Sequence, residues 1–293
     1  MKILLTGKTG QLGYELERTL QGLGEIVALD RQQMDLANVD QIRDVIRTVK
    51  PQLIINPAAY TAVDLAESNP DIAMRINAEA PEVMANEARK LGAAIIHYST
   101  DYVFDGEKSG SYMEADIPNP QSVYGRSKLA GEQAIQAAGI PHLILRTSWI
   151  YGLRGKNFLL TIKRLAEERD ELRIVADQFG APTWCRTIAE ATSYCVGRLQ
   201  SDVASTEINR EAWEAHSGLY HLSAQGQTSW HGFTQAIVAH PTISKKPKVT
   251  PISTQEYPLP AKRPQNSVLS SEKFIQTFCG LPNWDAALKL CMD

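Results

Sequence analysis

The sequence predicts an α/β fold with a doubly wound parallel sheet and a smaller C-terminal lobe. Three observations support this prediction. Short apolar segments alternate with segments of helical period over the first half of the chain, as in a sheet with helical crossovers. A Gly-x-x-Gly-x-x-Gly motif at residues 7–13 stands between the first strand and the first helix. Beyond residue 152 the alternation gives way to Gly- and Pro-rich loops, which indicates a second unit.

The elements before residue 152 follow from local signals. An apolar strand opens the chain, and the next segment carries Leu at every fourth position before two glycines end it. Asn38 caps a second amphipathic helix, which Pro51 stops. The strands expected in this half lie at residues 2–6, 26–29, 53–55, 93–98 and 142–150. The helices expected lie at residues 12–20, 39–50, 71–91 (broken near Pro81) and 124–138.

The glycine motif predicts a dinucleotide site, and with it a Rossmann-like domain. Gly7 would form the tight turn, Gly10 would let the backbone approach a pyrophosphate, and Gly13 would permit close helix packing. The helix N-terminus supplies free amides to the phosphates. Asp30 ends the next strand and can accept from the adenosine ribose, whereas Arg31 could hold the additional phosphate of NADP or be a solvated charge. We therefore expect both NADH and NADPH to be used, with NADPH slightly favoured.

The elements after residue 152 are shorter. Helices are expected at residues 158–168, 187–199, 271–278 and 283–290, and another opens at Ser229. A strand is expected at 172–176, an exposed polar connector at 201–217, a strand that rejoins the sheet at 218–223, and Pro-rich turns at 245–264. We assign 1–152 to a dinucleotide-binding domain, with returns near 172–200 and 218–224, and a substrate-binding lobe to 153–171 and 225–293.

Composition narrows the class of protein. The chain has 293 residues, 43% of them hydrophobic and 22% charged, and a net charge of -3, which gives no basic surface for nucleic acid. The first apolar run is too short for a signal peptide, and no later run approaches a membrane span. Four cysteines without a Cys-x-x-Cys pair indicate reduced thiols, and the six histidines form no zinc-like cluster. We expect a cytoplasmic protein that binds neither nucleic acid nor membrane.

Tyr124 and Lys128 predict an acid–base pair. They stand at i and i+4 of a helix and therefore share one face. The ammonium would lower the pKa of the phenol toward the working range, and Thr100, at the end of the preceding strand, could hydrogen-bond the same oxygen. The three groups could protonate a carbonyl oxygen while a hydride attacks its carbon. A half-buried Tyr beside a solvated Lys fits the same spacing, and the glycine motif is what favours catalysis.

Several blocks of sequence resemble the dTDP-4-dehydrorhamnose reductase family of the extended short-chain dehydrogenase/reductase superfamily. The most specific is Ser-Thr-Asp-Tyr-Val-Phe-Asp-Gly at residues 99–106. The other blocks lie at residues 7–13, 56–67, 124–132, 146–149, 177–183 and 263–267. The resemblance runs from residue 3 to about residue 275, so it covers both predicted units.

The resemblance implies a role for each motif. Tyr124 would donate a proton to the C4 oxygen of a sugar, Lys128 would hold the nicotinamide ribose and acidify Tyr124, and Thr100 would complete the triad. The implied cofactor contacts, with those predicted above, are Gly7, Gly10, Gln11, Leu12, Gly13, Asp30, Arg31, Asp35, Leu36, Ala58, Ala59, Tyr60, Thr61, Tyr124 and Lys128. The implied substrate contacts are Thr100, Asp101, Trp149 and Arg263, the last either as a partner of the diphosphate or as a surface charge.

The activity implied by the resemblance is NAD(P)H-dependent reduction of dTDP-4-dehydro-β-L-rhamnose at C4 to dTDP-β-L-rhamnose, the last step of dTDP-rhamnose synthesis for polysaccharides. Tyr102 stands where related dehydratases place a Glu base, which disfavours elimination of water. Another nucleotide-sugar reductase, an epimerase, or a non-catalytic cofactor-binding regulatory subunit are the alternatives. Some members of the family are associated with Mg²⁺ and form homodimers, so the resemblance allows both, and the sequence assigns no metal ligands.

Overall fold

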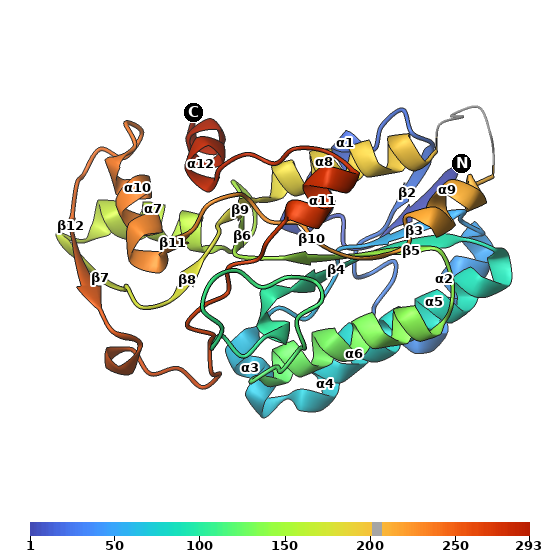
Figure 1. Cartoon of the computed structure of the whole chain (residues 1–293), viewed down its shortest axis with the longest axis horizontal. Coiled ribbons are helices and arrows are strands. Elements are labelled where there is room, and N and C mark those ends of the chain that lie inside the picture. Colours follow the sequence, from blue (N-terminus) through green and yellow to red (C-terminus); the bar gives the residue numbers. More distant parts are fainter. Residues whose placement is uncertain (201–206) are drawn as a thin grey trace.

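The computed structural model describes residues 1–200 and 207–293 and is organised around a central parallel sheet (Figure 1). Within these residues the sheet has six strands in the order β10-β5-β4-β3-β1-β2, each parallel to its neighbours. The strands are β1 (Lys2–Leu5), β2 (Glu25–Ala28), β3 (Leu53–Asn56), β4 (Ala94–Thr100), β5 (His142–Thr147) and β10 (Gly218–His221). The order reverses between β1 and β3, and ligands bind beyond the carboxyl ends of the strands at such a point. The predicted doubly wound fold is confirmed.

Helices cover both faces of the sheet (Figure 1). One face carries α1 (Gln11–Thr19), α8 (Cys185–Leu199) and α11 (Glu272–Thr277). The other carries α2 (Val39–Val49), α5 (Ala80–Leu91) and α6 (Val123–Ala137). Asn38 caps α2 as predicted, because its side chain accepts from the backbone N–H of Gln41 at 3.1 Å.

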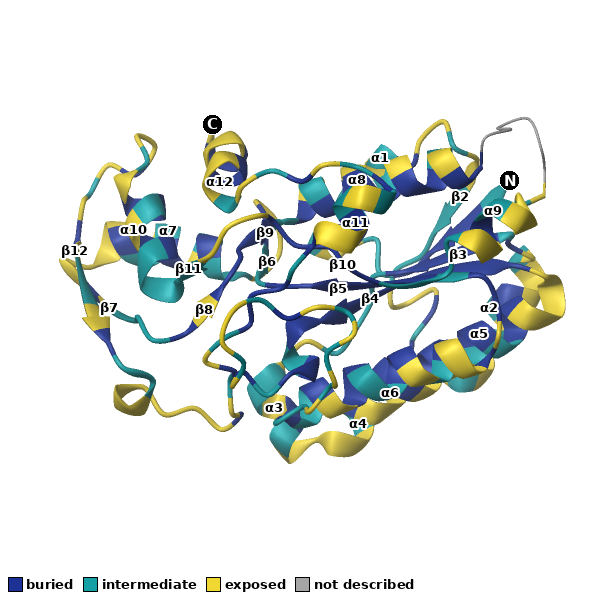
Figure 2. Cartoon of the chain, viewed as in Figure 1, coloured by how far each residue is buried: buried dark blue, intermediate teal, exposed yellow. Residues whose placement is uncertain are grey.

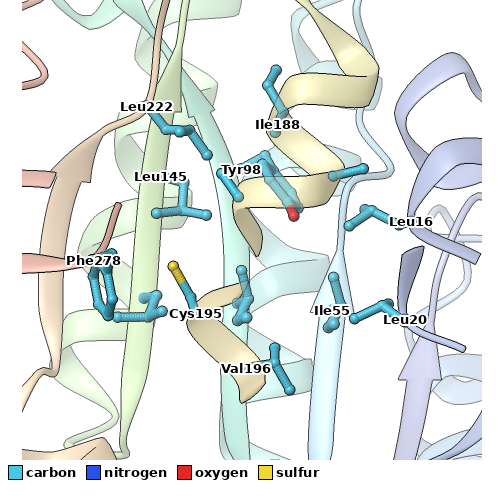
Figure 3. Close-up of a cluster of buried hydrophobic side chains, with 14 of the residues drawn as sticks. Leu16, Leu20, Ile55, Tyr98, Leu145, Ile188, Cys195, Val196, Leu222 and Phe278 are labelled. Atoms are coloured by element: carbon cyan, nitrogen blue, oxygen red, sulfur yellow. The ribbon is translucent and has the colours of Figure 1, made fainter. Parts of the chain in front are cut away.

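The hydrophobic core lies in two layers, one on each face of the sheet. Figure 3 shows the layer beneath α1 and α8, where Leu16 and Leu20 of α1 lie near Ile55 of β3. In the same layer the Tyr98 hydroxyl is hydrogen-bonded to Thr192 of α8 at 2.7 Å. Figure 2 shows that burial follows the strands and the inward stripes of the helices. Each fully buried aliphatic side chain of this kind stabilises the fold by roughly 1.5–3 kcal/mol.

The C-terminal lobe has its own apolar cluster and small paired strands. β7 (Glu171–Val175) pairs with β12 (Lys248–Ile252) in parallel, and α7 (Phe158–Glu168) and α10 (Trp230–Ala239) pack on them. The remaining elements here are β6 (Ile150–Tyr151), β9 (Thr183–Trp184), β8 (Phe179–Gly180), β11 (Thr228–Ser229) and α12 (Trp284–Met292). The strand near residue 172 was expected to return to the dinucleotide-binding domain. It is β7, which instead pairs with β12 in a separate two-stranded sheet.

Two segments depart from the sequence prediction. The helix expected to break at Pro81 runs through α4 (Pro70–Met74), a π-helix (Arg75–Glu79) and α5, because Pro81 lies in the first turn of α5, where its missing N–H costs little. The connector expected at 201–217 lies partly outside the described residues, at 201–206. Its later part forms α9 (Arg210–Ala215), a helix that was not predicted. Most of its residues are exposed as expected, but Trp213 is fully buried, so the expectation of exposure was wrong at that residue.

Other short elements were not predicted from the sequence. They include α3 (Val63–Ser68), the 3-10 turns Asp101–Val103 and Thr254–Glu256, and the strand β12, which contains Pro251. Among the described helices, none combines the length and the apolar composition that crossing a bilayer requires.

Candidate active site

A cleft of about 1860 Å³ lies between the carboxyl edge of the sheet and the C-terminal lobe. This volume exceeds the roughly 300–1,000 Å³ of a site for one small ligand, so there is room for two ligands side by side. Most predicted site residues line it, namely Gly7, Gly10, Gln11, Leu12, Gly13, Arg31, Asp35, Leu36, Ala58, Ala59, Tyr60, Thr61, Thr100, Asp101, Tyr124, Lys128, Trp149 and Arg263. Asp30 is not among the residues that line the cleft.

The glycine loop has the backbone geometry that a dinucleotide site needs. Gly7 adopts φ 60°, and a Cβ there would lie 2.9 Å from the Ala58 side chain. A Cβ on Gly13 would lie 2.1 Å from the Gly7 carbonyl oxygen, so only glycine lets α1 approach the loop. Gly10 caps α1 without a side-chain hydrogen bond, which leaves the first amides of α1 available to a pyrophosphate. The loop therefore fits the group that the motif predicts.

Asp30 and Arg31 follow β2 and lie beside Lys8 of the glycine loop. The Asp30 carboxylate accepts from the backbone N–H groups of Gln32 and Gln33 at 2.9 and 3.1 Å, so a local turn uses part of its acceptor capacity. Lys8 Nζ lies 3.9 Å from the same carboxylate, and the largely exposed Arg31 pairs with Asp35 at 3.5 Å. The cations beside Asp30 would suit an additional phosphate. Sequence reasoning missed Lys8, although its place inside the glycine motif marks it.

Asn77 of the π-helix positions the loop that ends β3. Its amide accepts from the Tyr60 N–H at 2.8 Å and donates to the Tyr60 carbonyl at 3.0 Å. The same amide nitrogen donates to Ser127 of α6 at 3.0 Å. The π-turn thus connects the cofactor-side loop to the helix that carries Tyr124, and such turns are frequent at functional sites. No sequence signal had identified Asn77.

Tyr124 and Thr100 meet at the cleft, but the electrostatics differ from expectation. Burial raises the pKa of Tyr124 to about 12; a hydrogen bond with Thr100 opposes this rise and the charge of Asp101 adds to it. The expected lowering of this pKa by Lys128 was wrong. The ammonium nitrogen lies 2.6 Å from the Tyr98 carbonyl and 3.0 Å from His97 Nε2, so its contacts are with β4. Tyr124 is therefore protonated at neutral pH and can act as a proton donor.

Asp101 is a buried carboxyl group next to this pair. Its oxygens accept from the Thr100 and Ser148 hydroxyls at 3.0 and 3.1 Å, and only 2% of the residue is exposed. Burial raises its pKa to about 6, although hydrogen bonds, Ser267 first among them, oppose the rise. A carboxyl group held in this way is ionised at pH 7 at a cost to stability, which is typical of functional sites.

We expect Asp101→Asn to stabilise the protein at pH 7. Because the folded pKa of about 6 lies above the unfolded value of 3.8, stability is lost as the pH rises between them, by about 3 kcal/mol in all. The amide carries no such cost, so urea unfolding at pH 7 should show a gain of about 1–3 kcal/mol. The gain should shrink toward zero near pH 4.

Asp105→Asn is the matched control for that measurement. The pKa of Asp105 is lowered, chiefly by the backbone N–H of Glu107, so its charge stabilises the fold above its unfolded pKa. Its replacement should therefore destabilise the protein at pH 7. A difference between wild type and Asp101→Asn that is the same at pH 7 and pH 4 would contradict the assignment.

Arg263 and Trp149 approach the cleft from the side of the lobe. Arg263 makes a bidentate pair with Asp64 at 2.8 and 3.0 Å, and this pair keeps the pKa of Asp64 below its usual value. Trp149 stacks on Trp230 with ring centroids 3.5 Å apart, and the ring of Phe158 is tilted against Trp230 with centroids 4.5 Å apart. Trp230 and Phe158 also line the cleft and were not predicted, because isolated aromatic residues give no motif.

The side chains of the described residues form no cluster of three or more His, Cys, Asp or Glu that could hold a metal ion. The described residues therefore do not support the Mg²⁺ site that the resemblance allowed. The groups that line the cleft include the Tyr124 phenol, the Thr100 hydroxyl, the buried carboxyl group of Asp101, the buried ammonium of Lys128 and the glycine loop.

Comparisons with known proteins agree with this geometry. The model of the RmlD substrate binding domain family matches residues 1–293. A dTDP-4-dehydrorhamnose reductase of Burkholderia thailandensis is 46% identical over 299 residues, which cover 100% of this chain and 98% of that protein. The crystal structure of a dTDP-4-dehydrorhamnose reductase from Clostridium acetobutylicum has a TM-score of 0.90 and 38% identity, covering 100% and 99% of the two chains.

A further solved structure bears on the cofactor. The dTDP-4-dehydrorhamnose reductase of Bacillus anthracis, crystallised in complex with NADP, has a TM-score of 0.88 and 34% identity, covering 99% of this chain and 98% of its own. Sequence and structural similarity thus extend over both the sheet and the lobe, which together form the cleft. Because the family match and these relatives cover the whole chain, the chain belongs to the dTDP-4-dehydrorhamnose reductase family.

Proposed function

We propose that the chain reduces the C4 ketone of dTDP-4-dehydro-β-L-rhamnose to dTDP-β-L-rhamnose with NADPH or NADH, the last step of dTDP-rhamnose synthesis. One observation carries the proposal. A full-length match to reductases of this name coincides with a cleft in which Tyr124, Thr100 and Lys128 all lie beside the glycine loop. The assignment of these three residues to the reaction is part of the proposal.

Each residue has a task that follows from its surroundings. Bound NADPH or NADH would supply the hydride to the C4 carbon. Tyr124 keeps its proton at neutral pH because burial raises its pKa to about 12, so its phenol can donate to the C4 oxygen. If the Thr100 hydroxyl turns its hydrogen from Asp101 to the Tyr124 oxygen, this hydrogen bond stabilises the phenolate that remains. Asp101 and Trp149 border the same space and would orient the sugar.

The cofactor and the substrate fit different parts of the cleft. The glycine loop and the backbone of residues 58–61 form the end beside β1 and β3, and they would hold the dinucleotide. Arg31, which lines the cleft, and Lys8, whose ammonium lies 3.9 Å from Asp30, favour NADPH over NADH as the preferred cofactor. Arg263 would have to exchange Asp64 for a diphosphate oxygen, and its bidentate geometry suits either partner.

A direct assay tests the proposal. Purified protein mixed with the 4-keto sugar nucleotide and NADPH should consume NADPH, and the product should be the 4-hydroxy sugar. An epimerase of the same superfamily would instead keep stoichiometric NAD through purification and consume none. Absence of turnover with either cofactor would reject the reductase function. A homodimer, which the resemblance allows, stays a prediction that light scattering after size exclusion can check.

A further inference from the structure

A chain of buried polar side chains runs from Lys128 across three neighbouring strands. His97, in the middle of β4, lies with Nε2 3.0 Å from Lys128 Nζ and with Nδ1 3.1 Å from the Asn56 amide nitrogen. Asn56 ends β3 and is the register partner of His97. Its side-chain oxygen Oδ1 accepts a hydrogen bond from the Thr6 hydroxyl at 2.6 Å. Each of these four residues is at most 2% exposed. The reaction proposed above assigns no task to His97 or Asn56.

The hydrogen count of Lys128 shows what His97 contributes. An ammonium group has three hydrogens to donate and accepts none. One goes to the Tyr98 carbonyl at 2.6 Å and a second to His97 Nε2 at 3.0 Å. Both acceptors belong to β4 and are fixed by the sheet, so together they prevent rotation about the Cε–Nζ bond. The third hydrogen is left for the cleft, which Lys128 lines.

The position of the hydrogen on His97 follows from the same geometry. Burial, with the nearby charge of Lys128, keeps the pKa of His97 well below its usual value, so the ring is neutral. A neutral imidazole has one donor and one acceptor nitrogen. If Nε2 accepts from Lys128, Nδ1 must donate, and it then needs an oxygen in front of it. A 180° turn of the Asn56 carboxamide supplies that oxygen at the same distance, and its NH₂ group then donates to Thr6.

We propose that His97 is a positioning residue for Lys128, and that Asn56 holds His97 in the Nδ1–H tautomer so that one hydrogen of Lys128 is aimed into the cleft. This inference rests on the proposed reductase function for its catalytic consequence. Its structural content, the tautomer, does not depend on that function.

The charged groups around Lys128 determine the expected pH dependence. The titratable groups that face it are His97 on β4, and Tyr124 and Glu132 one turn before and after it on α6. Glu132 is itself paired with Arg146 of β5. Burial lowers the pKa of Lys128 to about 8, and Glu132 opposes this. Below that pH the ammonium donates to His97; as the pH rises through it, the charge and the aimed hydrogen are lost, and activity should fall.

The first test is spectroscopic and needs no substrate. In ¹⁵N-labelled full-length protein at pH 7, two-bond ¹H–¹⁵N correlations of the His97 ring should show a hydrogen on Nδ1 and a bare Nε2. The His97→Gln variant assigns the signal among the six histidines. An Nε2–H tautomer, or a doubly protonated ring, would overturn the proposal whether or not the protein is a reductase.

The second test uses the pH profile of kcat. His97→Phe removes the acceptor, which disfavours the ammonium, so the alkaline limb should move to lower pH and kcat at pH 7 should fall about tenfold or more. His97→Gln keeps an acceptor, so its alkaline limb and its kcat at pH 7 should both lie closer to the wild-type values. His142→Phe is the matched control, since His142 begins β5 and its Nδ1 contacts the Ile140 carbonyl away from the cleft.

The outcomes separate the two proposals. A folded His97→Phe variant whose alkaline limb coincides with that of wild type shows that His97 is only a packing residue, and overturns the inference. Wild-type protein that binds cofactor but reduces no keto sugar rejects the proposed function, and the tautomer measurement still decides the inference. If His97→Phe does not fold, His97→Gln and the spectra of the wild type provide the decision.

Discussion

Replacing Tyr124 by Phe is expected to lower kcat by about 10²- to 10⁴-fold while cofactor affinity changes little. The substitution removes one oxygen, and a positioned general acid contributes an acceleration of about that size. The ring would still pack edge-on against Tyr102, whose centroid lies 5.6 Å away, so the shape of the cleft is kept. Steady-state kinetics with the keto sugar nucleotide, together with titration of NADPH binding by fluorescence, measure both quantities.

Tyr102→Phe is the control for that experiment. Tyr102 lines the same cleft, and burial likewise raises the pKa of its phenol. It lies on the turn after β4, however, and its hydrogen bond with Thr100 is made by its backbone N–H. Its loss should cost far less turnover than the loss of Tyr124. Equal effects of the two substitutions, or unchanged turnover in Tyr124→Phe, would show that the proton comes from another group.

Removing Arg146 alone is expected to destabilise the fold by about 3–5 kcal/mol. Its guanidinium makes two hydrogen bonds to Glu132, at 2.9 and 2.6 Å, and the two side chains are only 3% and 2% exposed. In Arg146→Met the Glu132 carboxylate would remain buried without a partner, which is more costly than the loss of the pair itself. Urea unfolding followed by circular dichroism gives the change in the free energy of unfolding.

Two comparisons test that explanation. The double variant Glu132→Leu with Arg146→Met removes both charges and should recover most of the lost stability, because apolar groups replace the pair. Arg164→Met breaks an ion pair of the same kind on α7, with Glu168, where the side chains are 62% and 50% exposed. That loss should be within about 0.5 kcal/mol. A double variant as unstable as Arg146→Met would refute the uncompensated-charge explanation.

The glycine loop and the pair on α6 could be predicted because their chemistry is local. A turn at Gly7 and the four-residue spacing of Tyr124 and Lys128 each depend on a few consecutive residues, and the structure has both. The direction of the Lys128 side chain could not be predicted in this way. It depends on a backbone carbonyl and an imidazole of β4, which the sequence separates by about thirty residues.

Other failures have the same origin in long-range contacts. β12 carries Pro251 within a Pro-rich stretch, so its local signal favours turns, and only pairing with the distant β7 makes it a strand. The polar segment that contains Trp213 resembles an exposed connector, yet packing against the core buries that one indole. Propensity and composition describe neighbours in sequence, and these elements are determined by neighbours in space.

Trp149 adopts φ 47°, a conformation that a non-glycine residue holds at a cost of roughly 1–2 kcal/mol. A glycine would accept this backbone without strain, but it would remove the indole that stacks on Trp230 and lines the cleft. Gly180 leaves room for the Trp149 indole, since a Cβ at position 180 would lie 2.5 Å from it. The indole therefore constrains two positions: Trp149 adopts a strained backbone conformation, and only glycine fits at position 180. The strained residue lines the cleft, and strained backbone conformations of this kind cluster at ligand-binding and active sites.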